Sequence, residues 1–181
     1  MLRIIAGKYK GLRIEQPDAK YTRPTTDKVR EAVFSSLQFK LVGSTCLDLF
    51  GGSGAWSIEA ISRGAGKVDT IEKNKIVAKV IQQNFAKTKQ ANEFNLIIQD
   101  ALIYLDNTNQ KYDFVFMDAP FIEYDLVSKC LEKLVSNNLL KEDFEIVLET
   151  NDFNNITLPD SLKVYKEKQY GKIGIYYLCQ K

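Results

Sequence analysis

The chain of 181 residues contains no histidine. Histidine is the usual general base near neutral pH and the commonest zinc ligand in proteins. Its absence excludes serine–histidine catalysis and most zinc sites, and the sequence predicts no metal site. A reaction carried out by this chain must therefore need little proton abstraction, or must use carboxylates instead.

Cysteines and long hydrophobic runs are also scarce. Cys46, Cys130 and Cys179 are odd in number, widely spaced and set among apolar residues. They match neither a disulfide framework nor a metal motif, so we expect buried free thiols in a reducing cytoplasm. No apolar run reaches the length of a membrane span, and the apolar part of the N-terminus is too short for a signal peptide. We therefore expect a cytoplasmic protein with no membrane partner.

Positive charge is concentrated at one end of the chain. The formal net charge is only +2, but residues 1–40 hold nine lysines and arginines against four acids. The whole chain is 45% hydrophobic, which is enough for the core of one domain. A basic end on a near-neutral body predicts an edge that binds a polyanion, although an ordinary solvated lysine face has the same composition.

The main motif is a glycine-rich turn at 51–54. The apolar segment 46–50 predicts a buried strand before it, and apolar residues from Ala55 onward recur at helical spacing. Glycines let the backbone approach a ligand closely, and the first N–H groups of a helix favour an anion. The carboxylate of Asp48 favours a cationic group, so an amino-acid moiety with both charges fits the turn. A tight turn without a ligand is the alternative.

The following strand indicates the kind of ligand. The dinucleotide pattern G-x-G-x-x-G fits poorly, because Ser57 stands where its third glycine belongs. The strand predicted at 67–71 is followed by Glu72, about 20 residues past the turn, where an acid commonly binds ribose hydroxyls. A solvated carboxylate beside a helix capped by Asn74 is the alternative. Together with the turn, this spacing favours the ribose role.

The rest of the chain alternates between strands and helices. Further strands are predicted at 95–99, 113–117 and 144–149, helices at 55–63, 74–88, 101–105 and 124–136, and a final hairpin from 162–168 and 173–179. This order predicts a doubly wound α/β fold with a mostly parallel sheet and an antiparallel hairpin at its edge. Ligands bind such sheets beyond the carboxyl ends of the strands. Four acids follow successive strands, so we expect Asp48, Glu72, Asp100 and Asp118 to line one crevice. Asp100 also fits a helix cap.

Residues 1–22 are predicted to form a hairpin extension of a main domain that spans 23–181. Two short apolar segments flank a glycine-containing tip, in which Lys8 and Lys10 stand on either side of Tyr9. Lysines suit phosphates and a tyrosine suits a stacked base, so this tip is a candidate RNA contact. A tip that is merely soluble is the alternative.

The stretch RPTTDKVRE, which begins at Arg23, leads into the first helix. Apolar residues recur at helical spacing over 29–37, and one of the threonines at 25–26 can cap that helix. Arg23 then lies near the helix start, where it can clamp a phosphate. Arg30 is a second candidate, although a local ion pair with Glu31 is the alternative.

Several motifs together resemble one family. DLFGGSG at 48–54, IEK at 71–73, QDA at 99–101 and DAPF at 118–121 resemble class I S-adenosylmethionine-dependent methyltransferases that modify amino nitrogens of bases. RIIAGKYKG at 3–11 and RPTTDKVREAVF at 23–34 are similar to the RsmD family, bacterial enzymes that methylate guanine N2 in 16S ribosomal RNA. The likeness runs over essentially the whole chain. It implies a Rossmann-like fold with a seven-stranded sheet, S-adenosylmethionine as cofactor, and 16S RNA or the small ribosomal subunit as partner. We expect a monomer.

The resemblance also implies roles for individual residues. It places the glycine turn against the methionyl moiety with Asp48 facing its amino group, Glu72 on the ribose, and Asp100 with the Ala101 backbone on the adenine. The expected cofactor residues are Asp48, Phe50, Gly51, Gly52, Ser53, Gly54, Glu72, Lys73, Asp100 and Ala101. The expected RNA-binding residues are Arg3, Lys8, Lys10, Arg13, Arg23, Thr25, Thr26 and Arg30. The expected catalytic residues are Asp118, Ala119, Pro120 and Phe121.

The catalytic tetrapeptide departs from the family pattern Asp-Pro-Pro-Phe at Ala119. In the family, the carboxylate of the first residue and the carbonyl of the second accept the amine hydrogens and turn the lone pair toward the methyl carbon. Ala119 keeps that carbonyl, and Pro120 holds it extended, but the fixed φ of a proline is lost. Phe121 is expected to stack on the flipped-out base.

Other functions stay open at this stage. A DNA adenine-N6 or cytosine-N4 methyltransferase uses a related tetrapeptide, but such enzymes usually carry a target-recognition domain for which we expect no room here. A catalytically inactive RNA-binding homologue is the second alternative, which Ala119 keeps open. A nicotinamide-dependent reductase is disfavoured by Ser57 in the glycine motif.

Overall fold

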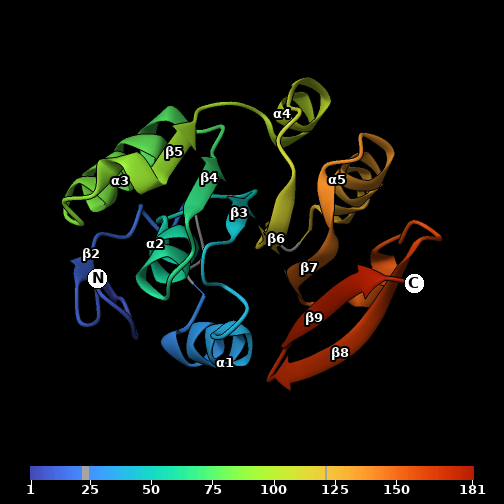
Figure 1. Cartoon of the computed structure of the whole chain (residues 1–181), viewed down its shortest axis with the longest axis horizontal. Helices are drawn as coiled ribbons and strands as arrows, with labels where there is room; N and C mark the ends of the chain where they lie inside the picture. The colour runs from blue at the N-terminus through green and yellow to red at the C-terminus, as the bar shows by residue number, and fades with distance from the viewer. Residues whose placement is uncertain (22–24, 121) are drawn as a thin grey trace.

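The computed structural model describes residues 1–21, 25–120 and 122–181. Its central sheet contains β3 (Thr45–Asp48), β4 (Lys67–Ile71), β5 (Phe94–Ile97), β6 (Tyr112–Met117), β7 (Leu140–Thr150), β8 (Leu162–Tyr170) and β9 (Ile173–Gln180). These strands lie in the order β5-β4-β3-β6-β7-β9-β8 (Figure 1). The first five are parallel, and β9 is antiparallel to both of its neighbours. This is the seven-stranded architecture with an antiparallel C-terminal hairpin that the sequence predicts.

Helices cover both faces of the sheet. The described residues form α1 (Asp27–Leu37), α2 (Ala55–Ser62), α3 (Lys75–Ala86), α4 (Ala101–Asn107) and α5 (Tyr124–Ser136), with short 3-10 turns at Ala91–Glu93 and Phe153–Asn155. Successive strand residues point to opposite faces, so Cys46 enters a core with α1, α2 and α3, whereas Leu47 enters one with α4 and α5. Among the described helices, none is both long and apolar enough to cross a membrane.

The local signals in the sequence explain where these elements begin and end. Thr26, predicted to bind RNA, caps α1 by accepting the backbone N–H of Val29 at 3.4 Å. The side chain of Asn74 caps α3 in the same way. Gly64 follows α2 with φ at +107°, a conformation that favours glycine and ends the helix. β4 and α5 have the predicted bounds, whereas β7 begins at Leu140, before the predicted residue 144.

The predicted N-terminal hairpin forms from β1 (Leu2–Arg3) and β2 (Arg13–Ile14), which pair over only two residues each. The hairpin is docked on α2, because the carboxylate of Glu59 accepts the backbone N–H groups of Ile5 and Ala6 at 2.9 and 3.1 Å. Isoleucines of the hairpin are buried in the same core as the first three helices. The division of the chain into two domains stays a prediction.

Arg30 lies beneath this hairpin and not on the surface. Its side chain is fully buried. One guanidinium nitrogen donates to the carbonyl of Arg3 at 2.5 Å and to Asp27 at 3.0 Å, and Nε lies 3.6 Å from Glu59. Local ion pairs form with Asp27 and Glu59, in place of the expected Glu31. The contact of Arg30 with RNA stays a prediction.

Candidate active site

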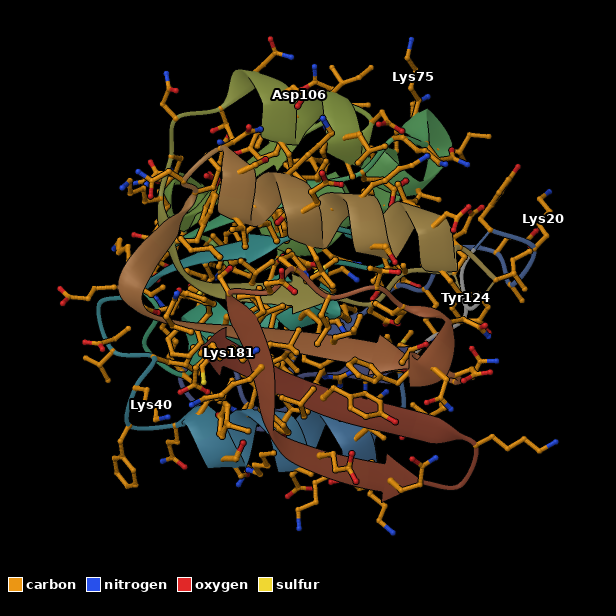
Figure 2. All side chains as sticks on the ribbon, turned by 90° about the vertical axis from the view of Figure 1, so that its right-hand side faces the viewer. Lys20, Lys40, Lys75, Asp106, Tyr124 and Lys181 are labelled. Carbon is orange, nitrogen blue, oxygen red and sulfur yellow. The ribbon has the colours of Figure 1, made fainter. Side chains whose placement is uncertain are left out.

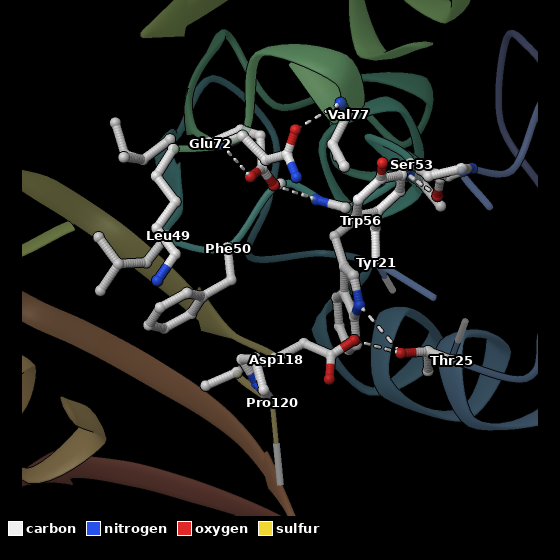
Figure 3. Close-up of a pocket in the computed structure, with 18 of the residues that line it drawn as sticks. Tyr21, Thr25, Leu49, Phe50, Ser53, Trp56, Glu72, Val77, Asp118 and Pro120 are labelled. Atoms are coloured by element: carbon white, nitrogen blue, oxygen red, sulfur yellow. Dashed lines mark hydrogen bonds between the residues drawn. The ribbon is translucent and has the colours of Figure 1, made fainter. Parts of the chain in front are cut away.

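A pocket of about 380 Å³ opens at the carboxyl ends of the central strands (Figure 3). In Figure 2, Lys20 and Tyr124 mark this end of the molecule and Lys40 the opposite end. One wall is the loop 16–21 of the N-terminal extension, which the sequence did not identify as part of the site. The predicted residues in the wall are Thr25, Arg30, Phe50, Gly51, Gly52, Ser53, Glu72, Lys73, Asp100, Ala101, Asp118, Ala119 and Pro120. The expected crevice therefore exists, and three of its four acids line it.

The glycine turn leaves room for a ligand beside bare backbone. Gly51 donates its N–H to the carbonyl of Ile71 at 2.8 Å, and a Cβ at Gly51 would lie 2.8 Å from the side chains of Ile81 and Thr70. Gly52 has φ at +55°, and a Cβ there would meet no atom closer than 3.9 Å. Because Gly52 lines the pocket, a side chain at this position would take space that a ligand needs.

Glu72 lies between the glycine turn and the start of α3. Its carboxylate accepts the backbone N–H of Gly52 at 3.2 Å and that of Asn74 at 2.8 Å (Figure 3). Burial raises the pKa of Glu72, against the opposing effect of these hydrogen bonds. Asn74 also caps α3, so the alternative expected for this segment is present in the same structure. The carboxylate is fixed in the pocket wall, and its contact with a ribose stays a prediction.

Asp48 is fully buried and is absent from the wall of the pocket. The hydroxyl of Ser57 lies 2.6 Å from Asp48 Oδ2 and donates to it, and it also contacts Thr70 at 2.7 Å. Asp48 Oδ1 is buried without a hydrogen-bond partner. Asp48 therefore lies beneath the turn, and its contact with an amino group stays a prediction. The structure also gives a reason for serine at 57, since a glycine there would remove the donor to Asp48.

Burial raises the pKa of Asp48 to about 7 from the ordinary value of 3.8. The folded chain therefore binds a proton that the unfolded chain has lost between these two pH values, and folding stability falls as pH rises through this window. Asp48→Asn should remove this dependence. The difference in unfolding free energy, variant minus wild type, should rise by up to about 1.4 kcal/mol per pH unit within the window. It should be constant above pH 7.

Urea unfolding followed by the fluorescence of the buried Trp56 measures this difference. Asp106→Asn is a matched control, because a hydrogen bond from Lys133 lowers the pKa of the exposed Asp106 carboxyl. The control should show no rise with pH. A pH-independent difference for Asp48→Asn would contradict the raised pKa.

Asp100 acts as a helix cap in this structure. Its Oδ1 accepts the backbone N–H groups of Leu102 and Ile103 at 2.9 and 3.3 Å. Asp100 and Ala101 both line the pocket as well, so the capping position and the predicted contact with adenine are compatible. The adenine contact stays a prediction. Within the described part of the chain, no three histidine, cysteine or acidic side chains gather as metal ligands would.

Asp118 follows β6 directly and reaches the pocket. Asp118 is half-buried, Ala119 is buried and Pro120 is exposed. All three residues line the pocket wall. Phe121, the fourth predicted catalytic residue, lies outside the described residues. The carboxylate of Asp118 and the carbonyl of Ala119 therefore come from the end of one central strand, next to the glycine turn at the end of another.

The hydroxyl of Thr25 forms a hydrogen bond with the Asp118 carboxylate. It lies 2.5 Å from Asp118 Oδ2 and 3.1 Å from Glu149 Oε2, and the indole of Trp56 donates to it at 3.4 Å (Figure 3). Thr25 is buried in the pocket wall, and its contact with RNA stays a prediction. The sequence analysis missed Trp56 and Glu149. Glu149 lies at the carboxyl end of β7, so the rule that found the other acids could have found it too.

The remaining basic candidates for RNA contact are placed in three ways. Lys10 and Arg13 are exposed on the hairpin. Lys8 and Arg3 each form an ion pair near the surface, at 2.7 and 3.0 Å respectively. Arg23 lies outside the residues that the structure describes. Contact of any of these residues with RNA stays a prediction.

Comparison with known proteins gives a consistent result. The family model described as "Conserved hypothetical protein 95" matches residues 2–179. Proteins named ribosomal RNA small subunit methyltransferase D are 33% identical in Escherichia coli K12 and 35% identical in Haemophilus influenzae. The alignments cover 99% of this chain in both cases, and 90% and 93% of the respective relatives.

Solved structures agree with these relatives. "Putative methyltransferase yhhF from Escherichia coli" matches with a TM-score of 0.89 and 30% identity, over 99% of this chain and 98% of that one. A more distant structure, SMU.776, is named as a methyltransferase complexed with SAH and matches with a TM-score of 0.61 and 15% identity, over 80% of this chain and 48% of that one. At that identity it supports the shared fold alone.

Proposed function

This chain belongs to the RsmD family of methyltransferases, and on that premise we propose that it transfers a methyl group from S-adenosylmethionine to the exocyclic N2 of a guanine in 16S ribosomal RNA. The observation that carries the proposal is the position of Asp118. Its carboxylate lies in one pocket with the glycine turn and Glu72. An acceptor for the amine and a cradle for the methyl donor are thus adjacent.

The residues of the pocket fit S-adenosylmethionine. Gly52 offers backbone with no side chain toward the pocket, and the buried Asp48 places a carboxyl group beneath the turn where the cationic amino-acid end would lie. The Glu72 carboxylate would accept the ribose hydroxyls, and Asp100 with Ala101 would lie against the adenine. When bound, the cofactor supplies a methyl carbon made electrophilic by its sulfonium group.

The work of the protein is alignment. The lone pair of an exocyclic base amine is drawn into the ring, so the amine is a poor nucleophile. Asp118 and the carbonyl of Ala119 each accept a hydrogen bond from the amine, which turns its lone pair toward the methyl carbon. The pocket wall excludes water. After transfer, the surplus proton passes to the Asp118 carboxylate or to water. This sequence of events needs no histidine.

Transfer of a labelled methyl group tests the proposal. The protein is incubated with labelled S-adenosylmethionine and unmethylated small-subunit RNA or particles, and the nucleosides are then analysed. Label in N2-methylguanosine is the expected result. Label in N6-methyladenosine or N4-methylcytidine would favour the alternative specificity, and no label on either substrate would overturn the proposed activity.

The basic hairpin gives a separate prediction about RNA affinity. Reversing the charges of Lys10 and Arg13 should weaken RNA binding and reduce the slope of log affinity against log salt by roughly 1 to 2, because each phosphate contact releases counterions. Filter binding over a series of salt concentrations measures this slope. Reversing Lys129 and Lys163, which are exposed on α5 and β8, is the control and should leave it nearly unchanged. If both double variants gave the same slope of log affinity against log salt, the hairpin would not contact the RNA phosphates.

A further inference from the structure

Thr25 joins three parts of the pocket through one hydroxyl group. The hydroxyl donates to Asp118 Oδ2 at 2.5 Å and lies 3.1 Å from Glu149 Oε2, while Trp56 Nε1 donates to it at 3.4 Å (Figure 3). Its partners come from the end of β6, from β7 and from α2. Thr25 is only 6% exposed, so bulk water has little access to these contacts.

The direction of the hydroxyl proton follows from the distances. A threonine hydroxyl carries one proton, and the shorter contact assigns it to Asp118. The N–H of Trp56 points at the same oxygen and restricts its rotation. A hydroxyl held on a carboxylate oxygen in this way orients the carboxylate and stabilises its charged form.

A second carboxylate, that of Glu149, lies beside this contact. β6 and β7 pair in parallel with Met117 opposite Leu148, so Asp118 and Glu149 follow at the same level on neighbouring strands. The hydroxyl of Thr25 lies within 3.1 Å of both groups, with its shorter contact to Asp118.

We propose that Thr25 is a positioning residue for methyl transfer, whose hydroxyl holds the Asp118 carboxylate turned toward the amine of the target base. The inference rests on the proposed function, in which Asp118 accepts a hydrogen of that amine. The proposal also gives a catalytic reason for one threonine of the RPTTD segment. The side chain that caps α1 is that of Thr26, so the hydroxyl of Thr25 is not needed to start the helix.

Thr25→Val removes the hydroxyl and nearly keeps the shape of the side chain. We expect the single-turnover rate at saturating S-adenosylmethionine and RNA to fall roughly 10-fold or more, as for loss of a hydrogen bond to a charged group. Cofactor affinity, measured by calorimetry, should not change. Thr25→Ser keeps the donor and should recover most of the rate.

Thr88→Val is the matched control for loss of a buried hydroxyl. Thr88 is 5% exposed, donates to the carbonyl of Phe85 at 2.6 Å, and does not line the pocket. This variant should lower the melting temperature by an amount similar to that of Thr25→Val. Its methyl-transfer rate should match that of the wild type.

A double-mutant cycle identifies the group through which Thr25 acts. If Thr25 positions Asp118, Thr25→Val should cost much less in an Asp118→Asn background than in the wild type. In a Glu149→Gln background it should keep most of its effect. Coupling to Glu149 in place of Asp118 would overturn the proposal.

Two further results would also overturn it: a full rate in Thr25→Val, or equal losses in Thr25→Val and Thr25→Ser. Wild-type protein that methylates no RNA would instead overturn the proposed function. The two failures are therefore distinguishable in one set of reactions.

Discussion

Asp118→Ala should lower the single-turnover rate of methyl transfer on the order of 10²-fold or more, because it removes the side chain that we propose aligns the amine. Asp118 is half-buried at the end of β6 and its carboxylate faces the pocket, so the sheet should keep its packing. Calorimetry should give an unchanged affinity for S-adenosylmethionine. The expected loss is therefore in the chemical step and not in the binding of the cofactor.

Graded substitutions at this site sharpen the result. Asp118→Asn should lose less than Asp118→Ala, because the amide oxygen still accepts one hydrogen bond. Ala119→Pro should be neutral or mildly beneficial, since it restores a fixed φ and keeps the carbonyl. Asp106→Ala, which removes an exposed carboxylate paired with Lys133 on the outer surface, is the control and should keep the rate (Figure 2). Transfer by Asp118→Ala at the wild-type rate would place the active site elsewhere.

Glu72→Ala and Gly52→Val should both weaken the binding of S-adenosylmethionine, for different reasons. Glu72→Ala removes the carboxylate that we expect to accept hydrogen bonds from the ribose hydroxyls, and a hydrogen bond to a charged group corresponds to roughly 10-fold or more in affinity. Gly52→Val places a branched side chain in the pocket at a φ of +55°, which such residues rarely adopt. We expect the larger loss for Gly52→Val, since it adds a steric barrier to backbone strain.

A glycine outside the pocket separates these two causes. Gly43 has φ at +72°, and a Cβ there would meet nothing within 4 Å, so Gly43→Val introduces similar strain without entering the site. Gly43→Val should lose stability in thermal unfolding and keep its cofactor affinity in calorimetry. RNA affinity should be nearly unchanged in all three variants. Unchanged cofactor affinity in both Glu72→Ala and Gly52→Val would mean that the cofactor does not bind at this turn.

The sequence by itself determined the fold class and the centre of the site, because both depend on local signals. Apolar periodicity distinguishes strands from helices, and alternation of the two requires crossovers that produce a parallel sheet. A threonine before α1 and Asn74 before α3 act through hydrogen bonds within one turn. The acids after strands meet because parallel strands end at one edge, which brought Glu72 and Asp118 into one pocket.

Tertiary structure decided which of the polar candidates are exposed to solvent. Arg30 and Asp48 carry the charges expected of ligand contacts, yet both are fully buried, because the hairpin covers one and α2 covers the other. The contact of Thr25 with Asp118 spans 93 positions of the chain, and that with Glu149 spans 124. No local pattern specifies such contacts. They arise only when burial of apolar surface on both faces of the sheet brings the N-terminal segment against the ends of β6 and β7.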